Sequence, residues 1–192
     1  MLPPGLEPAP VDGRHLVTIA AMRWAGGRLG VLPLPPFSQL NVRVYVEHEG
    51  EGAVFFAALR VTLSGLGGAL LGAPVRPATL RVRPGLVEAP GLGVRLAYEP
   101  GEPADPGELA RHGLGLFEAA GVRAFRAVRG EASWRRAEAT GPVRADPLLA
   151  LGFDVEGPPE LFCAERASFE VALPARRLPP GRPTDPERRV TP

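Results

Sequence analysis

The sequence contains no lysine. All 22 of its basic residues are arginines, and they face 21 acidic residues, so the net charge is +1. A Schiff base needs a side-chain amine that can lose its proton, and a guanidinium group does not supply one. Covalent catalysis through lysine is therefore excluded. The balanced charge also gives no general attraction for nucleic acid or for an anionic membrane surface.

Cysteine and long apolar runs are scarce as well. Cys163 is the only cysteine, which excludes an internal disulfide and a cysteine-based metal cluster. Its apolar neighbours Leu161 and Phe162 favour a buried side chain over a catalytic thiol. The longest uncharged run, residues 61–75, is too short to span a bilayer, and the N-terminus lacks the features of a signal peptide. A cytoplasmic protein with no membrane or nucleic-acid partner is expected.

Glycine and proline are abundant, with 24 of each in 192 residues. They divide the chain into short pieces, which favours strands over long helices. One domain is expected over 1–175 and a proline- and arginine-rich tail over 176–192. The patterns predict strands over 15–24, 28–34, 37–47, 53–61, 78–83, 93–99, 120–127, 131–140 and 166–173, with a turn at Arg129-Gly130, and short helical segments over 62–71, 105–112 and 146–151.

The segment 37–47 carries the clearest pattern in the chain. Its apolar residues Leu40, Val42, Val44 and Val46 alternate with hydrogen-bonding residues, and successive strand residues point to opposite faces. Over residues 39–47, one face is therefore wholly apolar. The other is wholly polar and includes an arginine, and it consists of Gln39, Asn41, Arg43, Tyr45 and Glu47.

Two segments carry a resemblance to a known family. The opening Leu2-Pro3-Pro4-Gly5-Leu6-Glu7 with Asp12-Gly13, and residues 39–46 followed by Gly52-Ala53-Val54-Phe55-Phe56, resemble motifs of the YqjF-like family of uncharacterised bacterial proteins. That family is related to acetoacetate decarboxylase. The resemblance implies an α+β, mostly β fold: an acetoacetate-decarboxylase-like antiparallel β-barrel or sandwich with a few short helices and a central ligand cavity.

The sequence departs from the decarboxylase at the residues that carry its chemistry. The run Gly72-Ala73-Pro74-Val75-Arg76 resembles the decarboxylase motif, but both of its lysines are absent, so the reaction is not carried over. Gln39 replaces an acidic residue usual before Leu-Asn. The chain also starts after an N-terminal strand and helix usual in the family, which is expected to expose a sheet edge; a homodimer is one way to cover it.

The candidate ligand-binding residues are Asn41, Arg43 and Tyr45, with Gln39 beside them and Arg76 on the loop that resembles the decarboxylase site. If the polar row faces the inside of a barrel, Arg43 needs an acid partner or an anion, because an unpaired buried charge is costly. A small carboxylate held by two hydrogen bonds would satisfy it. Alternatively, Arg43 pairs with Glu47, Gln39 or a cross-strand acid, and the row is a solvated face.

Three functional classes stay open. The first is a binder of a small organic anion without Schiff-base decarboxylase activity, its cavity walled by Phe117 and Trp134. The second is an enzyme of other chemistry, such as an isomerase, hydratase or hydrolase, using Tyr45 or an acid among Glu88, Glu99 and Glu118. The third is a structural protein with a filled barrel. His15, His48 and His112 show no metal-ligand spacing, and no phosphate loop or nucleophile elbow is complete, so no metal and no cofactor are expected.

Overall fold

The structure is a computed structural model that describes residues 2–29, 31–62, 74–110, 113–153, 157–172 and 175–178. Strands dominate these residues, as the sequence predicts. The helical segments are short: α2 Asp146–Ala150 and the 3₁₀ turns η1 Pro90–Leu92 and η2 Gly107–Ala110. Within these ranges, no helix has the length and apolar character needed to cross a bilayer.

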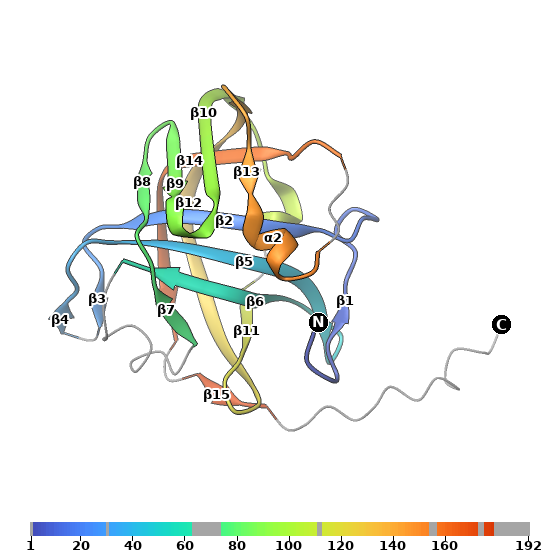
Figure 1. The fold of residues 1–192 in the computed structure, drawn as a ribbon. Helices are drawn as coiled ribbons and strands as arrows, with labels where there is room; N and C mark the ends of the chain where they lie inside the picture. Colours follow the sequence, from blue (N-terminus) through green and yellow to red (C-terminus); the bar gives the residue numbers. More distant parts are fainter. Residues whose placement is uncertain are drawn as a thin grey trace.

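One large twisted sheet forms the body of the molecule, and its hydrogen-bonded path runs in the order β1-β5-β6-β11-β12-β10-β9-β8 (Figure 1). Further strands attach at the sides: β2 to β5, β7 to β6, β13 to β10, and β14 and β15 to β12, while β3 pairs with β4 alone. The strands are β1 Glu7–Pro8, β2 Val17–Trp24, β3 Arg28–Leu29, β4 Leu32–Pro33, β5 Phe37–His48, β6 Glu51–Val61, β7 Val75–Pro77, β8 Arg81–Arg83, β9 Leu86–Ala89, β10 Val94–Pro103, β11 Leu114–Glu118, β12 Val122–Ala139, β13 Arg144–Ala145, β14 Leu161–Val171 and β15 Arg176–Arg177.

The expected antiparallel barrel needs two corrections. The sheet is mixed, because β6 pairs in parallel with both β7 and β11. It is also open: among the described residues, the path of hydrogen-bonded strands ends at β1 and β8 and does not return on itself. The strand β8 lies near β2 without pairing to it, so the sheet curls around an interior that it does not enclose.

The hairpin β5–β6 is the part of the sheet that the sequence predicts best. Its turn is Glu49-Gly50, and both residues have positive φ (54° and 80°), as a two-residue type I′ turn requires. The pairing continues from His48↔Glu51 to Gln39↔Val61, with one bulge on β6 at Ala57. Because a bulge adds local twist, the hairpin bends around the interior of the sheet.

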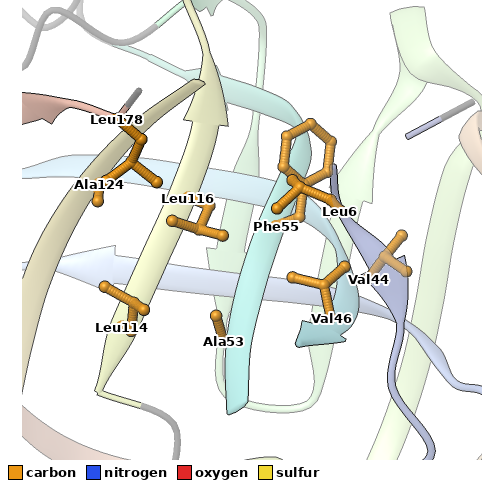
Figure 2. Close-up of a cluster of buried hydrophobic side chains, with 9 residues drawn as sticks. All are labelled: Leu6, Val44, Val46, Ala53, Phe55, Leu114, Leu116, Ala124 and Leu178. Carbon is orange, nitrogen blue, oxygen red and sulfur yellow. The ribbon is translucent and has the colours of Figure 1, made fainter. Parts of the chain in front are cut away.

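The apolar face of β5 packs into the main hydrophobic cores. Val44 and Val46 join a buried cluster with residues of β6, β11 and β12, and Leu6 and Leu178 complete it from the two ends of the described chain (Figure 2). Leu40 belongs to a second cluster with β9 and β10. Both clusters lie on one side of β5, so its polar row must face the other side.

The strand β12 differs most from the expected elements. The predicted turn at Arg129-Gly130 is wrong, because β12 runs without interruption from Val122 to Ala139. Its pairing with β14 shifts register between Arg129 and Trp134, as at β-bulges. A Cβ on Gly130 would overlap the hydroxyl of Ser168, so the glycine is needed for close approach of β14, not for a turn.

Other sequence predictions have mixed outcomes. The short helix at Asp146 is confirmed, and β7, β9 and β11 were not predicted as strands. The expected helix over 62–71 lies outside the described residues from position 63 onward, as does His112. In the expected tail, Arg176-Arg177 forms β15 against β12 and Leu178 is buried, while residues 179–192 lie outside the described ranges.

Candidate functional site

The polar row of β5 lines one wall of a cavity of about 2720 Å³ on the concave side of the sheet. Gln39, Asn41, Arg43 and Tyr45 all face it, and β2, β6, β12 and β14 contribute much of the remaining lining. Pockets for small ligands usually measure about 300–1,000 Å³. This space is a wide basin, of which a ligand would occupy only a part.

The strands on either side of β5 present apolar side chains to the same face. Asn41 is paired with Ala20 on β2 and with Leu59 on β6. Gln39 is paired with Met22 on β2 and with Val61 on β6. A solvated sheet face carries polar side chains on neighbouring strands as well. The polar residues of β5 therefore form a stripe with mainly apolar neighbours, Thr18 opposite Arg43 being the polar exception, as in binding sites where a few polar groups fix a ligand.

Asn41 is a fully buried amide in the stripe. Its exposed fraction is 1%, and its Oδ1 atom has no hydrogen-bond partner among the described residues. Leaving a buried amide oxygen unpaired costs roughly 1–3 kcal/mol. An unpaired amide next to an open cavity is suited to a hydrogen bond with a molecule that enters it.

Arg43 carries the charge of the site. It is partly buried, and its Nε donates a 3.2 Å hydrogen bond to Oγ1 of Thr18, the residue opposite it on β2. No carboxylate in the described part of the chain forms an ion pair with it, so the expected alternative of pairing with Glu47 or a cross-strand acid is not observed. Protein atoms around the guanidinium remove enough water to lower the pKa of Arg43, while Tyr45 acts in the opposite direction.

The two ends of the stripe are held by hydrogen bonds from other elements. The hydroxyl of Tyr45, whose exposed fraction is 1%, donates to the carbonyl oxygen of Leu109 in η2 at 3.3 Å. At the other end, Nε1 of Trp24 donates to Oε1 of Gln39 at 2.9 Å. These contacts fix the terminal side chains, and Asn41 and Arg43 lie between them.

Next to the stripe, a glycine and three aromatic rings form an apolar floor. Gly115 on β11 pairs with Phe125 on β12, and a Cβ at this glycine would overlap the Phe125 ring. That ring packs against Phe56 and Phe117, with centroids 5.6 and 6.1 Å away. Phe56 is the residue paired with Arg43 across β5 and β6, so this ring cluster begins beside the arginine.

Arg76 is not brought to the other candidate residues. It is exposed on β7 and pairs with Arg60 of β6, which is opposite Leu40 on β5. Paired residues share a face of a sheet, so Arg76 lies on the Leu40 side and Arg43 on the other. Its neighbour Val75 lines the cavity instead.

The acids suggested for an enzyme lie elsewhere. Glu88 approaches Arg81 and Arg95 at 3.8 and 3.9 Å on the far side of β9, and neither Glu99 nor Glu118 lines the cavity. Within the described ranges, no three His, Cys, Asp or Glu side chains gather in a way that could hold a metal ion.

Of the other residues singled out in the sequence, Phe117 and Trp134 do line the cavity. Cys163 on β14 is half-buried at the cavity wall, and desolvation raises the pKa of its thiol, which keeps it protonated.

Sequence reasoning missed Thr18, Trp24 and Leu109. Thr18 and Trp24 reach Arg43 and Gln39 because β2 pairs with β5, and Leu109 reaches Tyr45 because η2 packs against β5. These contacts depend on elements that are distant in the sequence. The strand pattern of 15–24 gave a usable signal for the first two, because Thr18 and Trp24 share one face in the alternation.

The comparisons with known proteins agree with this architecture. The family DUF2071, described as an uncharacterized conserved protein, matches residues 1–112. No curated protein matches the chain in sequence.

Solved structures match over most of the chain. An acetoacetate decarboxylase from Legionella pneumophila has a TM-score of 0.61 at 11% identity, and the match covers 91% of this chain and 76% of the decarboxylase chain. An acetoacetate decarboxylase-like enzyme from Sphingomonas wittichii RW1 has a TM-score of 0.55 at 16% identity, covering 92% and 84%. The enduracididine biosynthesis enzyme MppR complexed with pyruvate has a TM-score of 0.50 at 15% identity, covering 88% and 76%. At these identities the likeness shows an acetoacetate-decarboxylase-like fold.

Proposed function

Since the chain belongs to the DUF2071 family and has an acetoacetate-decarboxylase-like fold, we propose that it binds a small organic anion in its cavity and does not catalyse Schiff-base decarboxylation. The observation that carries the proposal is Arg43: a partly buried, desolvated cation with a neutral hydroxyl as its hydrogen-bond partner. A carboxylate is the ligand class that this cation would bind best.

The chemistry of the stripe supports a carboxylate in particular. Nε of Arg43 is used by Thr18, and its two terminal nitrogens are the pair that can hold both oxygens of a carboxylate. The amide of Asn41 lies one strand repeat away and can hydrogen-bond a polar group on the same ligand. Because water is partly excluded, these contacts would be stronger than at an exposed arginine.

The structural neighbours add indirect support. MppR, whose fold is similar, is described in complex with pyruvate, which is a small carboxylate. The decarboxylase reaction is not proposed for this chain, because it has no lysine to form a Schiff base.

The two rival functions have less support. A filled structural barrel fits poorly with a basin of about 2720 Å³. Among the residues considered for an enzyme of other chemistry, Tyr45 lines the cavity, but Glu88, Glu99 and Glu118 do not. Other carboxylates line the basin, and none of those in the described residues is bonded to Arg43.

Thermal unfolding with added carboxylates tests the proposal. Pyruvate, propionate and the neutral analogue pyruvamide are compared on wild type, on Arg43→Met and on Arg83→Met, in which an exposed arginine of the same cavity is removed. The carboxylates should raise the melting temperature of wild type and Arg83→Met, by an amount equivalent to about 2.7 kcal/mol at a hundred times the Kd. They should leave Arg43→Met unmoved. An equal shift in Arg43→Met, or no shift in wild type with any carboxylate, refutes the proposal.

A further inference from the structure

An aromatic cluster lies at the end of the cavity stripe that is remote from Tyr45. Trp24 on β2 and Phe37 on β5 are paired residues, and their rings stack with centroids 5.8 Å apart and an interplanar angle of 13°. Phe169 reaches the same place from β14, with its ring centroid 5.7 Å from that of Trp24 and tilted by 50°. All three rings line the cavity and are only partly buried, so apolar ring surface faces the open space.

The hydrogen bond between Trp24 and Gln39 fixes what the stripe presents next to these rings. The indole nitrogen can only donate, so Gln39 must turn its Oε1 toward it. The Nε2 group of Gln39 is then the part of the amide left to face the cavity, and it is a donor. From the rings toward Arg43, the wall therefore changes from aromatic surface to a donor, then to the unpaired amide of Asn41, and finally to a cation.

We propose that the natural ligand is an aryl-alkyl carboxylate, whose carboxylate lies at Arg43 and whose ring lies against Trp24, Phe37 and Phe169. This inference rests on the proposed function, because it uses the same cation. Three partly exposed rings are a surface that a flat apolar group would cover, by offset stacking or edge contacts.

The spacing along β5 decides how long such a ligand is. Arg43 lies six positions after Phe37 on β5, which is about 20 Å between their Cα atoms at a strand rise of about 3.3 Å per residue. Both the arginine and the rings reach into this interval. Acetate or pyruvate is nevertheless too short to contact both ends, so the ligand needs a spacer of several bonds between carboxylate and ring. The cavity, at about 2720 Å³, has room for it.

The protein supplies its own reporters for this test, because its two tryptophans, Trp24 and Trp134, both line the cavity. In a Trp134→Phe background Trp24 is the single tryptophan, at the proposed ring site. Titration with phenylacetate, 4-phenylbutyrate and 6-phenylhexanoate should change its emission, and the affinity should rise at least tenfold along this series. Octanoate is the matched control for apolar size, and we expect it to bind at least fivefold more weakly than 6-phenylhexanoate.

Variants separate this inference from the function on which it rests, with binding measured by calorimetry and folding checked by circular dichroism. Trp24→Leu should lower the affinity for 6-phenylhexanoate at least tenfold and leave propionate within twofold, while Trp24→Phe should retain most of the affinity. Arg43→Met should lose both ligands.

Each other outcome has one meaning. If propionate binds through Arg43 but phenyl and octyl chains add nothing, or octanoate equals the aryl series, the aryl specificity is refuted and the anion site stands. If 6-phenylhexanoate binds Arg43→Met as well as wild type, the anion site is refuted and the aromatic site stands. If no carboxylate binds wild type, both proposals fail.

Discussion

Replacing Arg43 with methionine should stabilise the ligand-free protein, although it removes a hydrogen bond. The guanidinium is desolvated, no carboxylate in the described chain pairs with it, and its pKa is lowered for this reason. Because Arg43 keeps partial contact with the cavity, we take about 3 kcal/mol for its desolvation, less than for a fully buried charge. The hydrogen bond from Arg43 to Thr18 offsets about 1.5 kcal/mol of this desolvation cost, as is usual for a charged donor. The difference predicts that the variant is more stable by about 1–2 kcal/mol.

Urea and thermal unfolding in a buffer without organic anions measure this difference. For a chain of this size, the expected rise in melting temperature is about 3–6 °C. The matched control Arg83→Met removes an exposed arginine and should change stability by less than about 0.5 kcal/mol. If Arg43→Met is less stable than wild type by 1 kcal/mol or more while the control is unchanged, the protein itself satisfies the guanidinium, and the argument for an anion site collapses.

Three further predictions follow from the packing and charge of the sheet. Asn41→Leu should keep or raise stability in urea, because it removes an unpaired amide, and should weaken pyruvate binding; a loss of more than about 2 kcal/mol would mean that the amide is satisfied. Gly115→Ala should destabilise the protein by about 1–3 kcal/mol, since the new methyl group displaces the Phe125 ring, and an unchanged urea midpoint would contradict this packing. Arg126 lowers the pKa of Glu51 through a bidentate pair at 2.8 Å, so this pair stabilises the fold at neutral pH and the effect is lost as the pH falls below the ordinary value of 4.5. Glu51→Gln should therefore reduce the acid-side slope of stability against pH, and an identical slope would show that the pair contributes nothing.

The sequence predicts β5 and its two faces because alternation is a local property. The Leu40 face is buried, as the pattern indicates. The pattern left open whether the Arg43 face meets solvent or a pocket, and in the structure it lines a cavity. The position of Arg76 was not predictable in the same way, because its face depends on parallel pairing with Arg60, a partner that no local pattern specifies. The contact of Trp24 with Gln39 likewise depends on the register of β2 against β5.

One error in the sequence-based prediction comes from glycine, which can be required at a position for two different physical reasons. At Arg129-Gly130 the glycine was interpreted as a turn, but it gives room to Ser168 on a neighbouring strand. The strand β11 was not predicted, and there Gly115 gives room to Phe125. Positive φ and close approach both select glycine, and only the neighbouring chain distinguishes them. At Glu49-Gly50, in contrast, both residues have positive φ and form the turn of the β5–β6 hairpin.

The long strand β12 has a consequence for the order in which the protein folds. The β5–β6 hairpin closes over a two-residue turn, whereas β11 joins β6, and β14 joins β12, only after long loops have closed. Loop-closure entropy makes such non-local pairings slow. The polar stripe on β5 therefore forms with the early hairpin, and Phe169 reaches it with one of the late strands. The aromatic surface at Trp24 and Phe37 is therefore completed only when β14 docks and brings Phe169 to it.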